Sequence, residues 1–103
     1  MEAMTTTANI AVSFGLTENE LFRQGVISFL YEKKRQVLQL KLEILARYRA
    51  NSLEDLEAKI ARGQVAEHPA WEDLIVAENL TTRLGELDAY LGDLQRVGND
   101  RSG

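Results

Sequence analysis

The apolar residues between positions 69 and 97 recur every seven residues, and this repeat constrains the chain more than any other feature. Two interleaved series carry it, namely Ala70, Ala77, Leu84 and Leu91, and then Leu80, Leu87 and Leu94. Series related in this way lie on one side of an α-helix, where they form the a/d seam of a coiled coil. Asp73 is the polar interruption of the seam. The repeat predicts a helix of about 29 residues, roughly 43 Å long, that packs one side against another helix.

A second long helix is predicted from Thr17 to about Tyr48. Thr17 and Glu20 form a capping box, in which the hydroxyl accepts from the third helical amide and the carboxylate accepts from the cap amide. No proline follows before position 48, and Gly25 is the one weak helix former. The apolar stripe of this segment is wide, and it includes the heptad series Leu30, Val37 and Ile44. A stripe of that width indicates burial on more than one side.

A short helix is predicted between the two long ones. After a break at positions 50–51, Ser52 and Asp55 form a second capping motif. Apolar residues at helical spacing follow at Leu53, Leu56 and Ile60. Gly63 is placed to end this helix at its C′ position. Pro69 suits the first position of the next helix, where its missing amide costs nothing.

These elements predict an all-α fold of two long antiparallel helices with a short helix between them. The hairpin domain occupies residues 17–97, after an arm at 1–16 and before a flexible tail at 98–103. Two helices alone cannot cover so wide an apolar stripe, so a homodimeric four-helix bundle is the preferred assembly. The alternative is that the spare face waits for a different protein.

The arm predicts a short strand, because its residues alternate in character. The apolar positions are Ala8, Ile10, Val12, Phe14 and Leu16, and the other face holds Asn9, Ala11, Ser13 and Gly15. A period of two with β-branched and aromatic residues is typical of a strand. Since the chain holds no second strand pattern, this strand would pair with its counterpart in another copy. The alternative is an extended arm lying on the helices.

Composition limits the remaining possibilities. The 103 residues suit one domain with a thin core of its own. The chain has no cysteine, which excludes disulfides, thiolate nucleophiles and cysteine-ligated metals. It has no apolar run long enough for a membrane helix and no secretory signal at its N-terminus, so we expect a cytoplasmic protein.

Charge divides the chain into two complementary parts. Residues 18–50 hold seven Lys/Arg and four Asp/Glu, for a net charge of +3. Residues 51–97 hold four Lys/Arg and ten Asp/Glu, for a net charge of −6. This division favours packing of one part on the other, either within one chain or between two copies.

Little in the sequence predicts catalysis. His68 and Glu72 are four residues apart and could share a helix face as metal ligands, but two ligands make a poor site. No glycine-rich nucleotide-binding motif occurs, and neither Ser13 nor Ser28 lies in a nucleophile pattern. We therefore predict a non-enzymatic protein with no metal and no other cofactor.

Nucleic-acid binding is a weaker alternative. Lys33, Lys34 and Arg35 form a basic run, but consecutive side chains point around a helix instead of along one stripe. The strand-like arm followed by the Thr17 cap and a helix resembles the start of ribbon–helix–helix proteins. That resemblance implies a strand-paired dimer that places outward residues in the DNA major groove. The outward positions Asn9, Ala11, Ser13 and Gly15 hold no Lys or Arg, and the first basic residue of the chain is Arg23.

The middle of the chain resembles small prokaryotic helical proteins that are antitoxin-like components of toxin–antitoxin modules. The residues that carry the resemblance are the run 52–60, then Gly63, then the run 67–73. The resemblance implies a small acidic protein that binds and neutralises a partner toxin.

We therefore predict a protein-interaction module, either antitoxin-like or a structural homodimeric adaptor. Trp71 is the expected anchor, because tryptophan is enriched in interaction hot spots. The residues expected at the hairpin or dimer seam are Leu30, Val37, Ile44, Leu84, Leu87 and Leu91. The substitution Leu87→Asp is expected to break the assembly.

Overall fold

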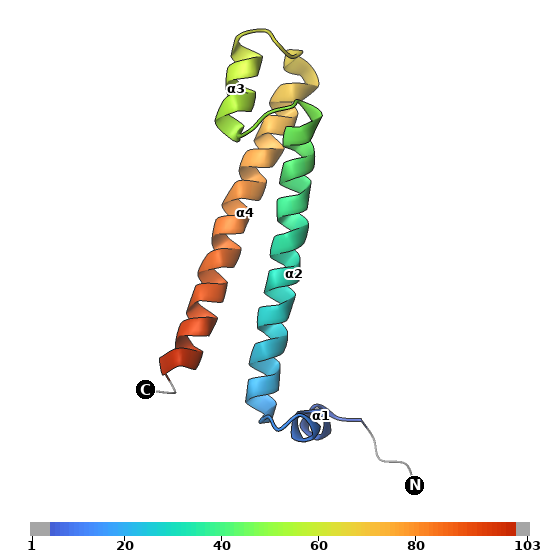
Figure 1. Ribbon diagram of the computed structural model, residues 1–103, viewed down its shortest axis with the longest axis vertical. Helices are drawn as coiled ribbons and strands as arrows, with labels where there is room; N and C mark the ends of the chain where they lie inside the picture. Colours follow the sequence, from blue (N-terminus) through green and yellow to red (C-terminus); the bar gives the residue numbers. More distant parts are fainter. Residues whose placement is uncertain (1–4, 101–103) are drawn as a thin grey trace.

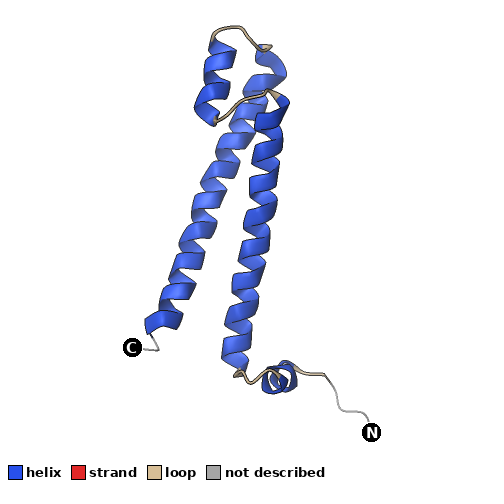
Figure 2. Ribbon diagram, in the orientation of Figure 1, coloured by secondary structure: helices blue, strands red, loops and turns tan. Residues whose placement is uncertain are grey.

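The computed structural model describes the backbone of residues 5–100 and the side chains of residues 5–96. Its described part consists of helices without a strand: α1 (Thr7–Ser13), α2 (Glu18–Arg47), α3 (Leu53–Ala61) and α4 (Glu67–Asp100). α2 and α4 form one long antiparallel hairpin, with α3 at the end where they are joined and α1 at the other end, beside the start of α2 (Figure 1). The expected all-helical architecture is confirmed, as the colouring by secondary structure shows (Figure 2).

The expected N-terminal strand is wrong, because Thr7–Ser13 is helical. The hydroxyl of Thr6 caps α1 by accepting from the Asn9 amide at 3.1 Å. A lone strand would leave its backbone amides and carbonyls without partners in this chain, whereas a helix pairs them locally. The strand-paired dimer, and the DNA-reading role that depended on it, lose their structural basis.

Both predicted caps at the starts of α2 and α3 are confirmed. In the first, the Glu20 amide donates to Thr17 Oγ1 at 3.0 Å, and the Thr17 amide donates to Glu20 Oε1 at 2.9 Å. In the second, the Asp55 amide donates to Ser52 Oγ at 3.0 Å, while the Asp55 carboxylate accepts from the preceding Asn51 amide at 2.8 Å. These bonds pair amides that have no partner within the helix, and so they fix where each helix begins.

Three helices end on a residue with positive φ. Gly15, Arg49 and Gly63 have φ values of 71°, 52° and 72° and follow α1, α2 and α3 in turn. In each case the next amide reaches back five residues to a helical carbonyl, at 2.9 Å. This is the Schellman ending, for which glycine is the usual residue. The predicted stop at Gly63 is thereby confirmed, and Arg49 performs the same role without glycine's freedom.

The start and end of α4 differ in how well the sequence predicts them. His68 has extended backbone angles, so the continuous helix begins at Pro69, as expected. At its other end α4 continues to Asp100, into the segment 98–103 that was expected to be a tail. Residues 101–103 of that segment lie outside the described residues.

The buried residues form two clusters along the hairpin. The cluster near the loop end joins α2, α3 and α4 and contains Ile44, Leu45, Leu56, Ile60, Ala70, Leu74 and Ala77. The cluster near the open end joins only α2 and α4 and contains Leu30, Val37, Leu87 and Leu91. Three leucines, Leu56, Leu74 and Leu87, are the largest fully buried side chains. The core is therefore thin, as expected for two paired helices.

The molecule is long and only one helix layer thick. Its extents are 67 × 40 × 16 Å and its radius of gyration is 20.5 Å, against about 13 Å for a globular chain of about 100 residues. Its accessible surface is 7542 Å², whereas a globular monomer of this mass exposes about 5,800 Å². The excess of about 1,700 Å² per chain is about twice the roughly 800 Å² that each partner buries in a standard protein interface. Nowhere in the described part is there a helix with the length and hydropathy needed to cross a bilayer.

Candidate interaction surface

The residues that the sequence named as a seam lie mostly inside the hairpin. Leu30, Val37, Leu87 and Leu91 form the cluster near the open end, Leu84 packs against it, and Ile44 belongs to the cluster near the loop. Trp71 is on the outside, with 42% of its surface exposed. The structure thus brings six of the seven residues together as the interior of one chain and leaves Trp71 apart from them. The candidates for an interaction surface are therefore the exposed apolar residues.

One flank of the hairpin carries a row of exposed apolar side chains from both long helices. We call it the open face and define it by Phe22, Phe29 and Leu40 of α2 with Val76 and Tyr90 of α4. The α2 residues are spaced by seven and eleven positions, which keeps them on one side of a helix. Val76 and Tyr90 are fourteen positions apart, or two heptads, and so also share a side. All five are exposed.

The open face has a hollow where α2 and α4 meet and another between α1 and α2. A shallow groove of about 280 Å³ is lined by Leu40, Ile44, Val76 and Leu80, with Glu43, Arg47 and Asp73 at its polar end. A second hollow of about 370 Å³ is lined by Thr7 of α1 and by Leu21, Phe22, Gly25, Val26 and Phe29 of α2. The Lys33 ammonium lies 5.8 Å from the centre of the Phe29 ring. Grooves lined mainly by aliphatic and aromatic groups suit apolar side chains of another helix.

The opposite flank is closed by contacts between the two long helices. Lys34 Nζ lies 2.7 Å from Asp88 Oδ1, and this hydrogen bond raises the pKa of Lys34. Further along, Gln95 Nε2 donates to the Tyr31 hydroxyl at 2.9 Å. α3 packs on α4 at the loop end of the hairpin. We call this flank the bridged face, and its polar contacts make it less suited to an apolar partner.

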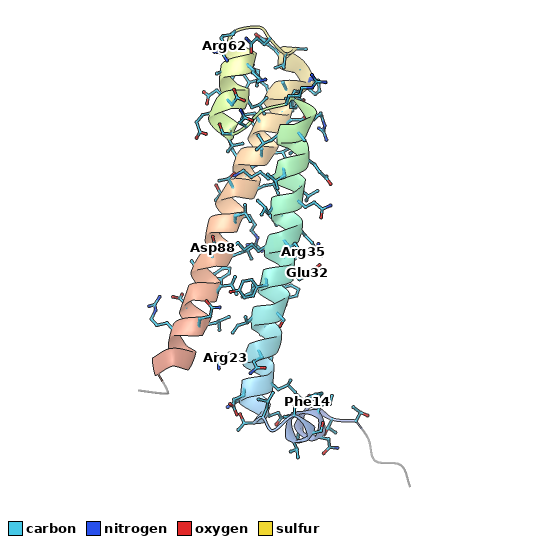
Figure 3. The ribbon with its side chains drawn as sticks, viewed as in Figure 1. Phe14, Arg23, Glu32, Arg35, Arg62 and Asp88 are labelled. Atoms are coloured by element: carbon cyan, nitrogen blue, oxygen red, sulfur yellow. The ribbon has the colours of Figure 1, made fainter. Side chains whose placement is uncertain are left out.

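Another apolar patch lies on the side of α2 away from α4. Leu38 and Leu42 line a hollow of about 500 Å³, with Arg35, Gln39, Glu43 and Ala46 around them. Arg35 Nε donates to Glu32 Oε2 at 3.0 Å, and this pair lies on the outer side of α2 (Figure 3). The hollow involves one helix only, so it offers no groove between elements. Of its two exposed leucines, Leu42 provides a control for the open face.

A polar cluster ties the two long helices together near the loop. The Tyr48 hydroxyl and Arg47 Nη1 both donate to Asp73 Oδ2, the latter at 2.9 Å. Burial, together with the bond to Asp73, raises the pKa of Tyr48. Asp73 is the residue that interrupts the apolar seam, and its partners explain how a carboxylate is accommodated there. The cluster is structural, because all three groups satisfy one another.

The pair that the sequence singled out as possible metal ligands forms a local contact. His68 Nδ1 lies 2.7 Å from Glu72 Oε1, and both side chains are exposed. A hydrogen bond from its own backbone amide and the contact with His68 lower the pKa of Glu72. Among the described residues, no three His, Cys, Asp or Glu side chains form a group that could hold a metal ion.

The open face was not predicted from the sequence, although a signal for it exists. Phe22, Phe29 and Leu40 interleave with the heptad series of α2, and in the sequence alone the two sets form one wide band. The band can be divided into two series, because Phe22, Phe29 and Leu40 are spaced by seven and eleven positions and lie to one side of the heptad series. That division would have distinguished the flank of α2 from its interior side.

Comparison with known proteins places most of the chain in a protein family. The model of the family described as "Uncharacterized protein MJ0235 family" matches residues 1–98, which include all four helices almost completely. No curated protein and no solved structure matches the chain.

Proposed function

This chain belongs to the MJ0235 family of uncharacterized proteins, and we propose that it is a non-enzymatic protein-interaction module that assembles with a second copy through its open face. The observation that carries the proposal is the row of five exposed apolar side chains on one flank of a single-layer hairpin. Exposed apolar surface of this extent on a small helical protein is typical of an interaction site.

The size of the open face supports an assembly of ordinary stability. α2 has 30 residues, which gives a length of about 45 Å, and two helices side by side are about 20 Å wide. The resulting area is about 900 Å², close to the roughly 800 Å² that each partner buries in a standard protein interface. A second hairpin laid on this face would complete a four-helix bundle and cover the thin core.

The absence of a catalytic role is part of the proposal and rests on the described hollows. Their linings are dominated by aliphatic and aromatic side chains, and at the polar end of the groove Arg47 pairs with Asp73. The single histidine lies on the surface beside Pro69, away from these hollows. Such linings favour apolar docking over acid–base chemistry.

A matched pair of leucines tests the proposal. Leu40 on the open face and Leu42 on the outer side of α2 are 51% and 53% exposed, so Asp at either position leaves the interior of the hairpin intact. Leu40→Asp is expected to weaken self-association at least tenfold, because it places a charge in the apolar centre of the interface. Leu42→Asp is expected to leave it unchanged. Light scattering over a concentration series gives the dissociation constants.

The reverse pattern, with Leu42→Asp dissociating the assembly and Leu40→Asp leaving it intact, would place the interface on the outer patch of α2. Circular dichroism of both variants provides the control for folding. Leu87→Asp is a poorer test, because Leu87 is 1% exposed within its own hairpin and a charge there would unfold the monomer.

A second candidate is the antitoxin-like role, in which the open face receives a different protein. The net charge of −4 favours a basic partner. Co-expression with the product of an adjacent gene tests this role. A stoichiometric complex with the wild-type chain but not with Leu40→Asp would support it, and an assembly that contains this chain alone would count against it.

A further inference from the structure

The charges along the two long helices define how a second copy would sit on the open face. This inference rests on the proposed self-association. We infer that the two copies are related by a twofold axis parallel to the helices, so that α2 of each copy lies against α4 of the other.

The two helices carry opposite charge over the stretch where they lie side by side. Between residues 33 and 47, α2 has five Lys/Arg and one Glu. Between residues 72 and 93, α4 has six Asp/Glu and one Arg. The ion pairs Lys34–Asp88 and Arg47–Asp73 show that these stretches lie at the same level along the hairpin. Summed around each helix, and including Lys34 and Asp88 on the bridged face, one long edge of the hairpin therefore has a net positive charge and the other a net negative charge.

Two symmetric arrangements can bring the open faces of two hairpins together. With the twofold axis perpendicular to the helices, α2 lies on the partner's α2 and α4 lies on the partner's α4. This places basic edge on basic edge and acidic edge on acidic edge, which is unfavourable at an interface. With the axis parallel to the helices, each basic edge meets an acidic edge. Neighbouring helices are then all antiparallel, as in an up-down-up-down bundle.

The parallel axis also determines which residues of the two copies face each other. Rotation about this axis leaves the height of every residue along the helices unchanged. Phe29 of one copy then lies level with the partner's Tyr90, and Leu40 lies level with the partner's Leu80. At these two levels apolar residues of one copy meet apolar residues of the other. The same rotation places both α1 helices at one end of the assembly and both α3 helices at the other. The assembly thus has two different ends.

The chain has no cysteine, so introduced cysteines report this arrangement directly. Gln36 and Arg83 are exposed polar residues on the open-face flanks of α2 and α4, at about the same level. Within one chain the two side chains point to the same side of the hairpin. For two ideal helices whose axes are about 10 Å apart, their Cα atoms are about 12 Å apart. A disulfide needs a Cα separation below about 7 Å, so it cannot form within a chain. In the inferred dimer, Gln36 faces the partner's Arg83.

The experiment compares the double variant Gln36→Cys/Arg83→Cys with the two single variants under mild oxidation. The inference predicts a covalent dimer for the double variant and none for either single variant, on a non-reducing gel. A covalent dimer from Gln36→Cys alone or from Arg83→Cys alone would overturn the parallel axis, because like helices would then be in contact. A double variant that stays uncross-linked while light scattering shows a dimer would overturn it as well.

The two proposals fail in distinguishable ways. A chain that is monomeric by light scattering and gives no cross-link refutes self-association, and the inferred arrangement is refuted with it. A dimer with the wrong cross-links refutes only the arrangement. Reduction of the covalent dimer to 11.6 kDa chains is the control that the link is a disulfide.

Discussion

At the scale of single residues, the hairpin depends on a few polar groups placed where the apolar seam is interrupted. Asp73 would be costly among leucines without partners, and Tyr48 and Arg47 both donate to it. Arg49 takes a backbone conformation that favours glycine. A hydrophobic pattern shows neither the contacts of Asp73 nor the backbone strain at Arg49. The interruption at Asp73 could therefore be predicted from the sequence, but its partners could not.

The Tyr48 hydroxyl is expected to make stability depend on alkaline pH. Its pKa is raised in the folded chain, first by burial and then by Asp73, so the folded state holds this proton more tightly than the unfolded state. Its contribution to the free energy of unfolding is fully present below a pH of about 10, the pKa of tyrosine in the unfolded chain. This contribution is lost as the pH rises through the higher pKa of Tyr48 in the folded chain. Thermal unfolding between pH 8 and 11 is expected to decline less steeply for Tyr48→Phe. Equal slopes for the variant and the wild type would contradict this.

Arg49 and Gly63 form a matched pair of helix ends. Both have positive φ, which costs a residue with a side chain about 1–2 kcal/mol. Arg49→Gly is therefore expected to raise the free energy of unfolding by up to about 1 kcal/mol, and Gly63→Ala to lower it by about 1 kcal/mol. Because an added Cβ at Gly63 meets nothing within 4 Å, only the backbone term is tested there. Urea unfolding measures both, and a destabilising Arg49→Gly would show that its side chain matters more than its φ.

At the scale of elements, helices with caps and heptads could be predicted and the short first helix could not. α2, α3 and α4 begin close to the capping residues or proline that predicted them. α1 has only seven residues, and its alternation of apolar side chains is equally typical of a strand. What decides between helix and strand there is the supply of backbone partners. The sequence pattern contains no information on that supply.

α3 is expected to depend on one leucine for its attachment. Leu56 is fully buried between α3 and the rest of the cluster near the loop. Leu56→Ala is expected to lower the free energy of unfolding by about 2–5 kcal/mol. Hydrogen exchange should then accelerate most strongly in residues 53–61, because α3 has few other buried side chains. Uniform acceleration along the whole chain would instead show that α3 and the hairpin unfold as one unit.

At the scale of the whole molecule, the sequence predicted a hairpin with surplus apolar surface but not where that surplus lies. The interior seam follows from the heptad repeat. The open face depends on which flank is closed by Lys34–Asp88, Tyr31–Gln95 and α3. The Lys34–Asp88 and Tyr31–Gln95 contacts join residues more than fifty positions apart, and the packing of α3 joins different helices, so periodicity within one helix cannot predict them. The proposed interaction site depends on this difference between the two flanks.

The most direct test of the proposed self-association is the mass of the wild-type chain in solution, measured by light scattering at two concentrations well separated in value. Self-association through the open face predicts twice the 11.6 kDa chain mass at both concentrations, because each hairpin is then covered by a second copy. A mass of 11.6 kDa at both concentrations would contradict it, since the open face would then be free in solution.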